Sequence, residues 1–218
     1  MNENLKKYFS YVFPLTKKIP SEFSGNLEIT WYNGKKYLNT KNANYSYGSL
    51  QKILHFGLEK ISLKNYNSIL ILGMGGGSVI QTLRNDFHFK KKITTLDIDP
   101  KIIEIAKSEF GIHENENLEI LCEDAFHFVE KKLIFDGIII DLFIDSNVPE
   151  KFYKKDFWKN VMKNISKNGF IIFNASLENT IQNELENIQK LLEENGFQIS
   201  IFEKVENTNT LVLALKNE

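Results

Sequence analysis

The chain has 218 residues, of which 42% are apolar and 25% charged, and its formal net charge at pH 7 is −1. This composition supports a buried core of ordinary domain size and excludes a disordered or strongly basic protein. There is no run of eighteen apolar residues and no apolar leader sequence, so we expect no membrane contact and a cytoplasmic protein.

Two further classes of protein are disfavoured by the sequence. Arg clusters interleaved with aromatic residues, which are typical of a nucleic-acid-binding face, are missing, so no nucleic-acid partner is expected. No His, Cys or carboxylate spacing indicates a metal site. The single Cys122 falls in a strand-like segment, which predicts a buried and reduced thiol.

The first sixty residues differ in pattern from the rest of the chain. Residues 27–32 and 36–39 flank Asn33-Gly34, a strong signal for a β-hairpin turn. Apolar residues then recur at helical spacing over 49–63. We therefore predict an N-terminal β-hairpin element over residues 1–47, followed by a second domain over 48–218.

From residue 68 onward, apolar strands alternate with segments of helical periodicity. The predicted strands are 68–73, 92–97, 118–122, 135–141, 169–174, 197–203 and 210–215. The predicted helices are 78–85, 100–110, 124–131, 150–165 and 178–194. This alternation predicts an α/β fold with a mostly parallel sheet and helices on both faces. No helix separates the last two strands, which should pair antiparallel at the sheet edge.

The first strand of this sheet leads into the turn Gly73-Met74-Gly75-Gly76-Gly77-Ser78. Glycines let a ligand lie directly against the main chain, and a helix that begins at Ser78 points its free N–H groups toward it. A dinucleotide turn needs glycine where this chain has Ser78, and no P-loop sequence is present. The turn therefore indicates a nucleoside without a pyrophosphate, such as S-adenosylmethionine.

Carboxylates follow the next three strands, at the edge where an open sheet of this kind binds its ligand. Asp97 is placed to accept hydrogen bonds from a ribose diol, while Asp99 caps the helix that begins at Pro100. Asp124 either accepts the exocyclic amine of an adenine or caps the following helix. Asp141 ends a fully apolar strand, where an unpaired carboxylate is costly to bury, so we expect it to face the cleft.

Taken together, these positions resemble the spermidine synthase family within the class I S-adenosylmethionine-dependent methyltransferase fold. The resemblance implies a Rossmann-like fold with a seven-stranded sheet and a small N-terminal β element. It implies that Asp141 lies next to an attacking amine. It also implies a cofactor site made of Gly73, Gly75, Gly76, Gly77, Ser78, Asp97, Ile98, Asp124 and Ala125, in which Asp97 holds the ribose and Asp124 the adenine.

The chain departs from this family at two places. Polyamine synthases read G-G-G-D-G-G at the turn, and that aspartate holds the ammonium tail of decarboxylated S-adenosylmethionine; we expect Ser78 at this position. They also read D-S-S-D-P after the fourth strand, whereas here Ile144 takes the second carboxylate position and Asp145 is displaced by one. A serine does not repel the carboxylate of intact S-adenosylmethionine. We therefore expect a methyltransferase that uses the intact cofactor.

Two other functions stay open. The chain could be an aminopropyltransferase that uses decarboxylated S-adenosylmethionine, with Asp145 or Glu150 as the second acceptor carboxylate. It could also be a non-catalytic nucleoside-binding relative. The resemblance places Gln51 and Tyr47 near the cofactor and a small-molecule acceptor, an amine being the leading candidate. It also implies a homodimer through the N-terminal element.

Overall fold

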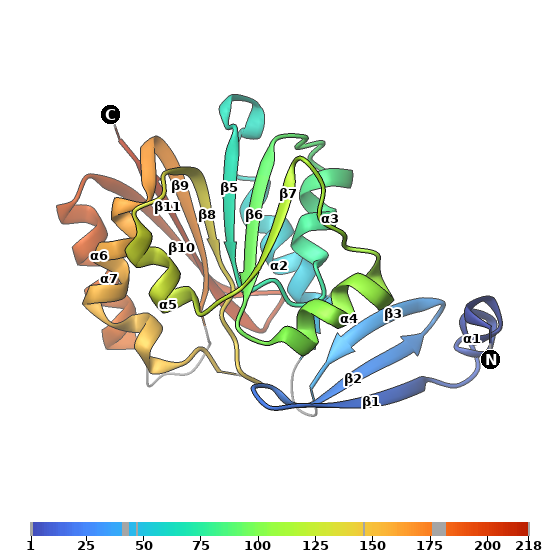
Figure 1. The fold of residues 1–218 in the computed structure, drawn as a ribbon. Helices are drawn as coiled ribbons and strands as arrows, with labels where there is room; N and C mark the ends of the chain where they lie inside the picture. Colours follow the sequence, from blue (N-terminus) through green and yellow to red (C-terminus); the bar gives the residue numbers. More distant parts are fainter. Residues whose placement is uncertain (1, 41–43, 47, 146, 176–181, 218) are drawn as a thin grey trace.

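The computed structural model describes residues 2–40, 44–46, 48–145, 147–175 and 182–217. Within them the chain forms two sheets that lie side by side (Figure 1). The larger sheet has seven strands in the order β10-β11-β9-β8-β5-β6-β7. Its strands are β5 (Ser68–Leu72), β6 (Lys92–Asp97), β7 (Leu118–Cys122), β8 (Phe135–Ile140), β9 (Ile165–Ala175), β10 (Phe197–Val205) and β11 (Asn209–Lys216).

The central strands pair in parallel, and β11 pairs antiparallel with both β9 and β10. This arrangement confirms the predicted α/β fold with its antiparallel edge. Residues 69–72 of β5 and 137–140 of β8, at the centre of the sheet, are fully buried because both of its faces are covered. Leu70 and Leu72 of β5 pack toward one face, while Ile69 and Ile71 pack toward the other, as the two-residue period of a strand requires.

Helices cover both faces of this sheet (Figure 1). One face packs against α5 (Ala125–Phe128), α6 (Lys155–Lys163) and α7 (Gln182–Glu194), and the other against α2 (Ser49–Leu58), α3 (Ser78–Asn85) and α4 (Pro100–Phe110). The helix predicted over 150–165 is divided into a 3₁₀ turn at Glu150–Tyr153 and the shorter α6. No helix in the described ranges is long and apolar enough to cross a membrane.

The N-terminal region is more than the predicted hairpin. A short helix, α1 (Glu3–Phe9), precedes a four-stranded antiparallel sheet in the order β1-β2-β3-β4. Its strands are β1 (Leu15–Ser21), β2 (Gly25–Tyr32), β3 (Lys35–Asn39) and β4 (Asn44–Ser46). Since apolar residues of β2 and β3 share a buried cluster with Ile102 and Ile105 of α4, the two sheets are joined through that helix. A domain boundary at residue 47 stays a prediction.

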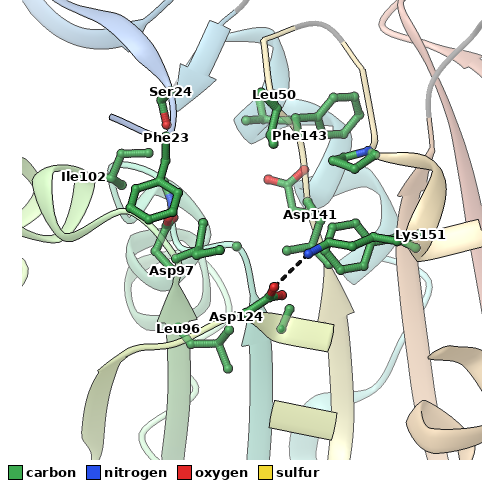
Figure 2. Close-up of a pocket in the computed structure, with 18 residues that line it drawn as sticks. Phe23, Ser24, Leu50, Leu96, Asp97, Ile102, Asp124, Asp141, Phe143 and Lys151 are labelled. Atoms are coloured by element: carbon green, nitrogen blue, oxygen red, sulfur yellow. Dashed lines mark hydrogen bonds and ion pairs between the residues drawn. The ribbon is translucent and has the colours of Figure 1, made fainter. Parts of the chain in front are cut away.

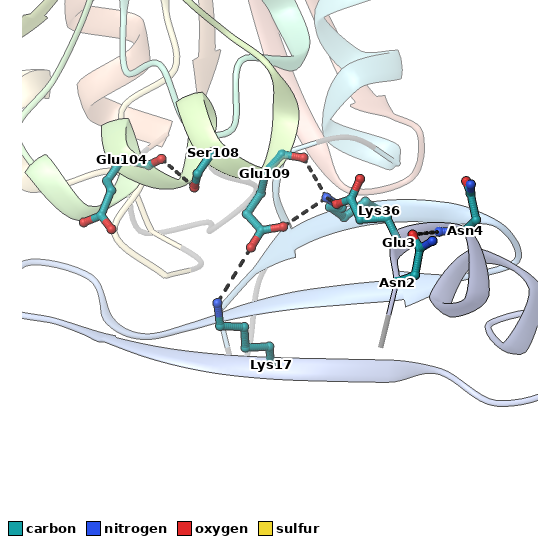
Figure 3. Close-up of polar contacts among 8 residues, drawn as sticks. All are labelled: Asn2, Glu3, Asn4, Lys17, Lys36, Glu104, Ser108 and Glu109. Carbon is teal, nitrogen blue, oxygen red and sulfur yellow. Dashed lines mark hydrogen bonds and ion pairs between the residues drawn. The ribbon is translucent and has the colours of Figure 1, made fainter.

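Polar contacts at both ends of α4 hold the N-terminal sheet in place. At the C-terminal end, Lys36 Nζ lies 2.8 Å from the carbonyl oxygen of Glu109 and 3.0 Å from its Oε2 (Figure 3). A cation is favourable there because the helix dipole is negative at this end. At the N-terminal end, the hydroxyls of Ser21 and Ser24 both donate to Oδ2 of Asp99. The turn between β1 and β2 is thereby fixed beside the strand ends that carry the candidate site.

Candidate active site

A cavity opens at the carboxyl ends of β5, β6, β7 and β8, and the β1–β2 turn forms part of its wall (Figure 2). It encloses about 820 Å³ of empty space, a figure that includes open solvent at its mouth. Its lining residues are Phe23, Ser24, Leu50, Gly73, Gly75, Leu96, Asp97, Ile98, Ile102, Asp124, Ala125, Asp141, Leu142, Phe143, Ile144, Pro149, Lys151 and Phe152. Most of this lining is apolar, so its few charged groups determine which ligand it can hold.

Asp97 ends β6 with only 8% of its surface exposed. Its carboxylate accepts hydrogen bonds from the backbone N–H groups of Gly75, at 3.1 Å, and Asp99, at 3.0 Å. Burial raises the pKa of Asp97 to about 6, and these two hydrogen bonds to the charged form oppose that rise. A carboxylate fixed in this way beside the glycine turn can accept hydrogen bonds from a ribose diol.

The glycine turn follows a path that side chains would block. Gly73 has a φ of +90°, and a Cβ there would lie 2.1 Å from the carbonyl oxygen of Asp141. The absence of that Cβ lets the turn pass close to the end of β8. Gly77 takes the left-handed conformation at the N-cap of α3, with a φ of +84°. Gly73 and Gly75 line the cavity, so the turn offers main-chain atoms to a ligand.

Ser78 lies outside the lining of this cavity, and its contact with the cofactor stays a prediction. It is the first residue of α3, 4% exposed, and it is not among the residues that line the cavity; Gly76 and Gly77 are not among them either. Counted from Gly73, the fourth position of the polyamine synthase turn falls on Gly76, which has no side chain. Either assignment leaves the turn without a carboxylate. The electrostatic argument therefore depends on that missing acid and not on a serine hydroxyl.

Asp124 caps the following helix, one of the two roles that its position allowed, whereas its contact with an adenine stays a prediction. Its Oδ1 accepts from the backbone N–H of Phe126 at 2.9 Å and so caps α5, while its Oδ2 pairs with Lys151 Nζ at 2.7 Å across the cavity (Figure 2). Burial raises the pKa of Asp124, but the hydrogen bonds from Lys151 and Phe126 outweigh it and hold the pKa below its ordinary value. The carboxylate is thus ionised and directed toward the cavity.

Asp141 is placed directly after β8, and its carboxylate is held by Asn174 of β9. The Nδ2 of Asn174 donates to Oδ1 of Asp141 at 2.9 Å, and Asn209 Nδ2 donates to Oδ1 of Asn174 at 2.9 Å. Burial, together with the nearby charge of Asp97, raises the pKa of Asp141 to about 6, and the Asn174 hydrogen bond opposes this rise. A group with such a pKa is ionised at neutral pH and can still take up a proton.

Among the residues expected on the acceptor side, those that the structure describes are not part of the cavity lining. Gln51 donates to Thr82 of α3 at 3.0 Å and lines a separate, open hollow between α2 and β3. Asp145 accepts from the hydroxyl of Thr40. Glu150 is exposed and pairs with the neighbouring Lys154. Tyr47 lies outside the described residues.

Several residues that line the cavity or support its lining were not foreseen, and the reasons differ. Asn174 is a polar residue at the end of an apolar strand, the same signal that identified Asp97 and Asp141, so the sequence could have revealed it. Phe23 and Lys151 come from segments whose position depends on how the N-terminal sheet and the loop after β8 pack against the central sheet. Sequence periodicity carries no signal for that packing.

Cys122 ends β7 with its thiol exposed, so the prediction of a buried thiol was wrong; the residue terminates the strand at the outer edge of the sheet. In the part of the chain that the structure describes, no three His, Cys, Asp or Glu side chains cluster closely enough to hold a metal ion.

Comparisons with known proteins agree with this geometry. The family described as the spermine/spermidine synthase domain matches residues 48–205. Polyamine aminopropyltransferase 2 of Aquifex aeolicus is 36% identical over 123 residues, which is 52% of this chain and 24% of that protein. Because the family matches well over half of the sequence, the chain belongs to the spermine/spermidine synthase domain family.

Solved structures share the fold. The spermidine synthase of Thermotoga maritima matches with a TM-score of 0.62 and 17% identity, covering 92% of this chain and 72% of that chain. Human methyltransferase-like protein 13 in complex with SAH matches with a TM-score of 0.64 and 19% identity, covering 78% and 82%. The fold is thus the Rossmann-like fold that class I methyltransferases and spermidine synthases have in common. The matched region covers less than half the length of the curated relatives.

Proposed function

We propose that this protein is a transferase that binds a sulfonium nucleoside of the S-adenosylmethionine type and delivers a carbon group to an amine. One observation carries the proposal. Asp124, Asp97 and Asp141 follow β7, β6 and β8, and together with the glycine turn after β5 they line a single cavity. The membership in the spermine/spermidine synthase domain family supports the same chemistry.

Each charged residue then has a separate task. Asp124 would accept the adenine amine through the carboxylate that Lys151 now contacts, and Asp97 would accept hydrogen bonds from the ribose. Main-chain atoms of Gly73 and Gly75 would contact the rest of the nucleoside. When bound, the sulfonium supplies a carbon that is activated by a good leaving group. Catalysis would rest mainly on positioning the amine against that carbon.

Asp141 is the residue that we assign to the reacting amine. Its carboxylate would hydrogen-bond the amine, and it would accept the proton that the nitrogen loses as its lone pair forms the new carbon–nitrogen bond. The carbon–sulfur bond breaks with its electron pair going to sulfur. The raised pKa of Asp141 suits this task because a base works best when its pKa lies near the working pH.

Transfer of an aminopropyl group from decarboxylated S-adenosylmethionine is the form of this reaction that the family and the curated relatives support. The relatives with 36% and 31% identity over half of this chain are named polyamine aminopropyltransferases. Methyl transfer from intact S-adenosylmethionine is the second candidate. It is favoured by the glycine turn, where no carboxylate would repel the carboxylate of the intact nucleoside.

Transfer is tested by incubating the protein with each nucleoside and a mixture of amines, and identifying the products by mass spectrometry. We expect an aminopropylated amine with the decarboxylated nucleoside, and turnover reduced by about a hundredfold or more in Asp141→Asn. A methylated product formed only from the intact nucleoside would decide for the second candidate. If both nucleosides bind and neither yields a product, the chain is a non-catalytic relative and the proposal fails.

A further inference from the structure

We infer that the acceptor of this site is an amine with a single positive charge and an apolar body, and that diamines are poor acceptors. The inference rests on the proposed transfer to an amine, but it holds for either transferred group. It concerns the part of the cavity around Asp141, the residue assigned to the reacting amine. It begins from the side chains that flank this carboxylate.

The wall beside Asp141 is apolar. Leu50 comes from α2, while Phe143 and Ile144 follow β8, and all three line the same cavity as Asp141. Figure 2 shows Leu50 and Phe143 on the side of the Asp141 carboxylate that faces away from Asp124 and Lys151. An acceptor held by Asp141 would therefore lay the rest of its body against aliphatic and aromatic carbon.

Among the described residues that line the cavity, Asp141 is the one carboxylate not assigned to the nucleoside. Asp141 already accepts from Asn174 at one oxygen, which leaves the other for an ammonium or amine group. The remaining acids of this segment are engaged elsewhere, since Asp145 accepts from Thr40 and the exposed Glu150 pairs with Lys154. Among the described residues of the lining, the other carboxylates are Asp97 and Asp124, which are assigned to the nucleoside.

This arrangement makes a second charge on the acceptor costly. An ammonium buried against an apolar wall gives up its hydration without gaining a partner. A hydrocarbon chain or an aromatic ring gains from the same burial. The one cation among the described residues of the lining, Lys151, is paired with Asp124 and is no partner for a second ammonium group. The site should therefore bind a monoamine more tightly than a diamine of equal length.

The test is a calorimetric titration of the protein saturated with methylthioadenosine, using pentylamine and putrescine as two probes of similar length. We expect pentylamine to bind about tenfold or more tightly than putrescine. Equal binding, tighter binding of putrescine, or binding of neither amine would overturn the inference. Failure of methylthioadenosine itself to bind would instead refute the proposed function, so the two failures are distinguishable.

A pair of variants tests the cause of the preference. Ile144 is 51% exposed, so an acid can be introduced there with little effect on folding. We expect Ile144→Asp, which adds a carboxylate three residues after Asp141, to shift the preference toward putrescine by about tenfold or more. Glu150→Gln removes an acid from the same segment and should leave the preference unchanged. If Glu150→Gln shifts the preference and Ile144→Asp does not, residues other than those beside Asp141 recognise the charge of the acceptor, and the inference is wrong.

Discussion

Asn174 donates a side-chain hydrogen bond to the carboxylate of Asp141 at 2.9 Å, and in turn it accepts one from Asn209. The three residues belong to β9, the end of β8 and β11, so the antiparallel edge of the sheet supports the group next to the reaction centre. Asn174 is fully buried, and its amide therefore has a fixed orientation. The arrangement holds one oxygen of Asp141 in place and leaves the other to the cavity.

Replacing Asn174 by leucine, which has a similar size, removes the donor to Asp141. Without this hydrogen bond to its charged form, the pKa of Asp141 should rise further. We expect kcat to fall by about tenfold to a hundredfold, with little change in nucleoside affinity, and the pH profile of kcat to shift upward. Asn209→Leu removes only the donor to Asn174 and leaves the hydrogen bond to Asp141, so it should reduce kcat less. An unchanged kcat and pH profile in Asn174→Leu would contradict this positioning role.

Buried carboxylates also give the stability of the free protein a specific pH dependence. Asp97 and Asp141 have pKa values of about 6 in the folded state, above the ordinary value of 3.8. The folded state therefore binds protons more tightly than the unfolded state, and these groups destabilise the fold as the pH rises from about 4 to about 6. Between about pH 5 and about pH 7.5, each group should lower the free energy of unfolding by about 1 kcal/mol.

Urea unfolding of the wild type and of Asp97→Asn at both pH values checks this expectation. Asparagine carries no charge at either pH, so the variant should lose a smaller amount of stability over the interval. Nucleoside affinity should change in the opposite direction in the wild type, rising with pH through about 6 as Asp97 ionises. A wild-type protein that gains stability between these pH values relative to Asp97→Asn would contradict the burial of an ionisable Asp97.

A pair of variants separates the two roles of Asp124, the cap on α5 and the charge that faces the cavity. Asn is as good an N-cap as Asp, so Asp124→Asn should keep the cap on α5, whereas Asp124→Ala loses it at a cost of about 1 kcal/mol. Both variants lose the charge that pairs with Lys151 and that we propose as the acceptor for the adenine amine. We expect both to lose nucleoside affinity by about tenfold or more, and only the alanine variant to lose stability. Wild-type affinity in Asp124→Asn would exclude an adenine contact.

Asp99 joins the N-terminal sheet to the site and can be tested by stability alone. It caps α4 through the backbone N–H of Lys101, and it accepts from Ser21 and Ser24. Asp99→Ala removes all three contacts and should destabilise the protein by about 2 kcal/mol in urea unfolding. Asp99→Asn keeps acceptor oxygen and should lose less. Equal losses in the two variants would show that the hydrogen bonds do not hold the turn that carries Phe23.

The sequence predicted the central sheet and the strand-end carboxylates because both follow from local pattern. Asp97 and Asp141 each end a buried apolar strand, and parallel strands bring such ends to one edge. Which residues lie on the acceptor side depends on the direction in which each side chain of α2 points. Leu50 lines the cavity whereas its neighbour Gln51 contacts α3, since adjacent residues of a helix point in directions about 100° apart.

The N-terminal region was underestimated for a related reason. The turn at Asn33-Gly34 marks β2 and β3, but β1 exposes three lysine or threonine side chains in succession and shows little apolar alternation. Its place in the sheet comes from main-chain pairing with β2. The position of Phe23 in the cavity wall then follows from the contacts of Asp99, which no local pattern reveals.

The central claim is that this cavity binds a sulfonium nucleoside through Asp97. It is tested most directly by calorimetric titration with decarboxylated S-adenosylmethionine and, separately, with S-adenosylmethionine, for the wild type and for Asp97→Asn. We predict saturable binding of at least one nucleoside at a single site, weakened by about tenfold or more in the variant. The tighter of the two nucleosides identifies the transferred group. Absence of binding for both, or equal binding to the wild type and Asp97→Asn, would contradict the account.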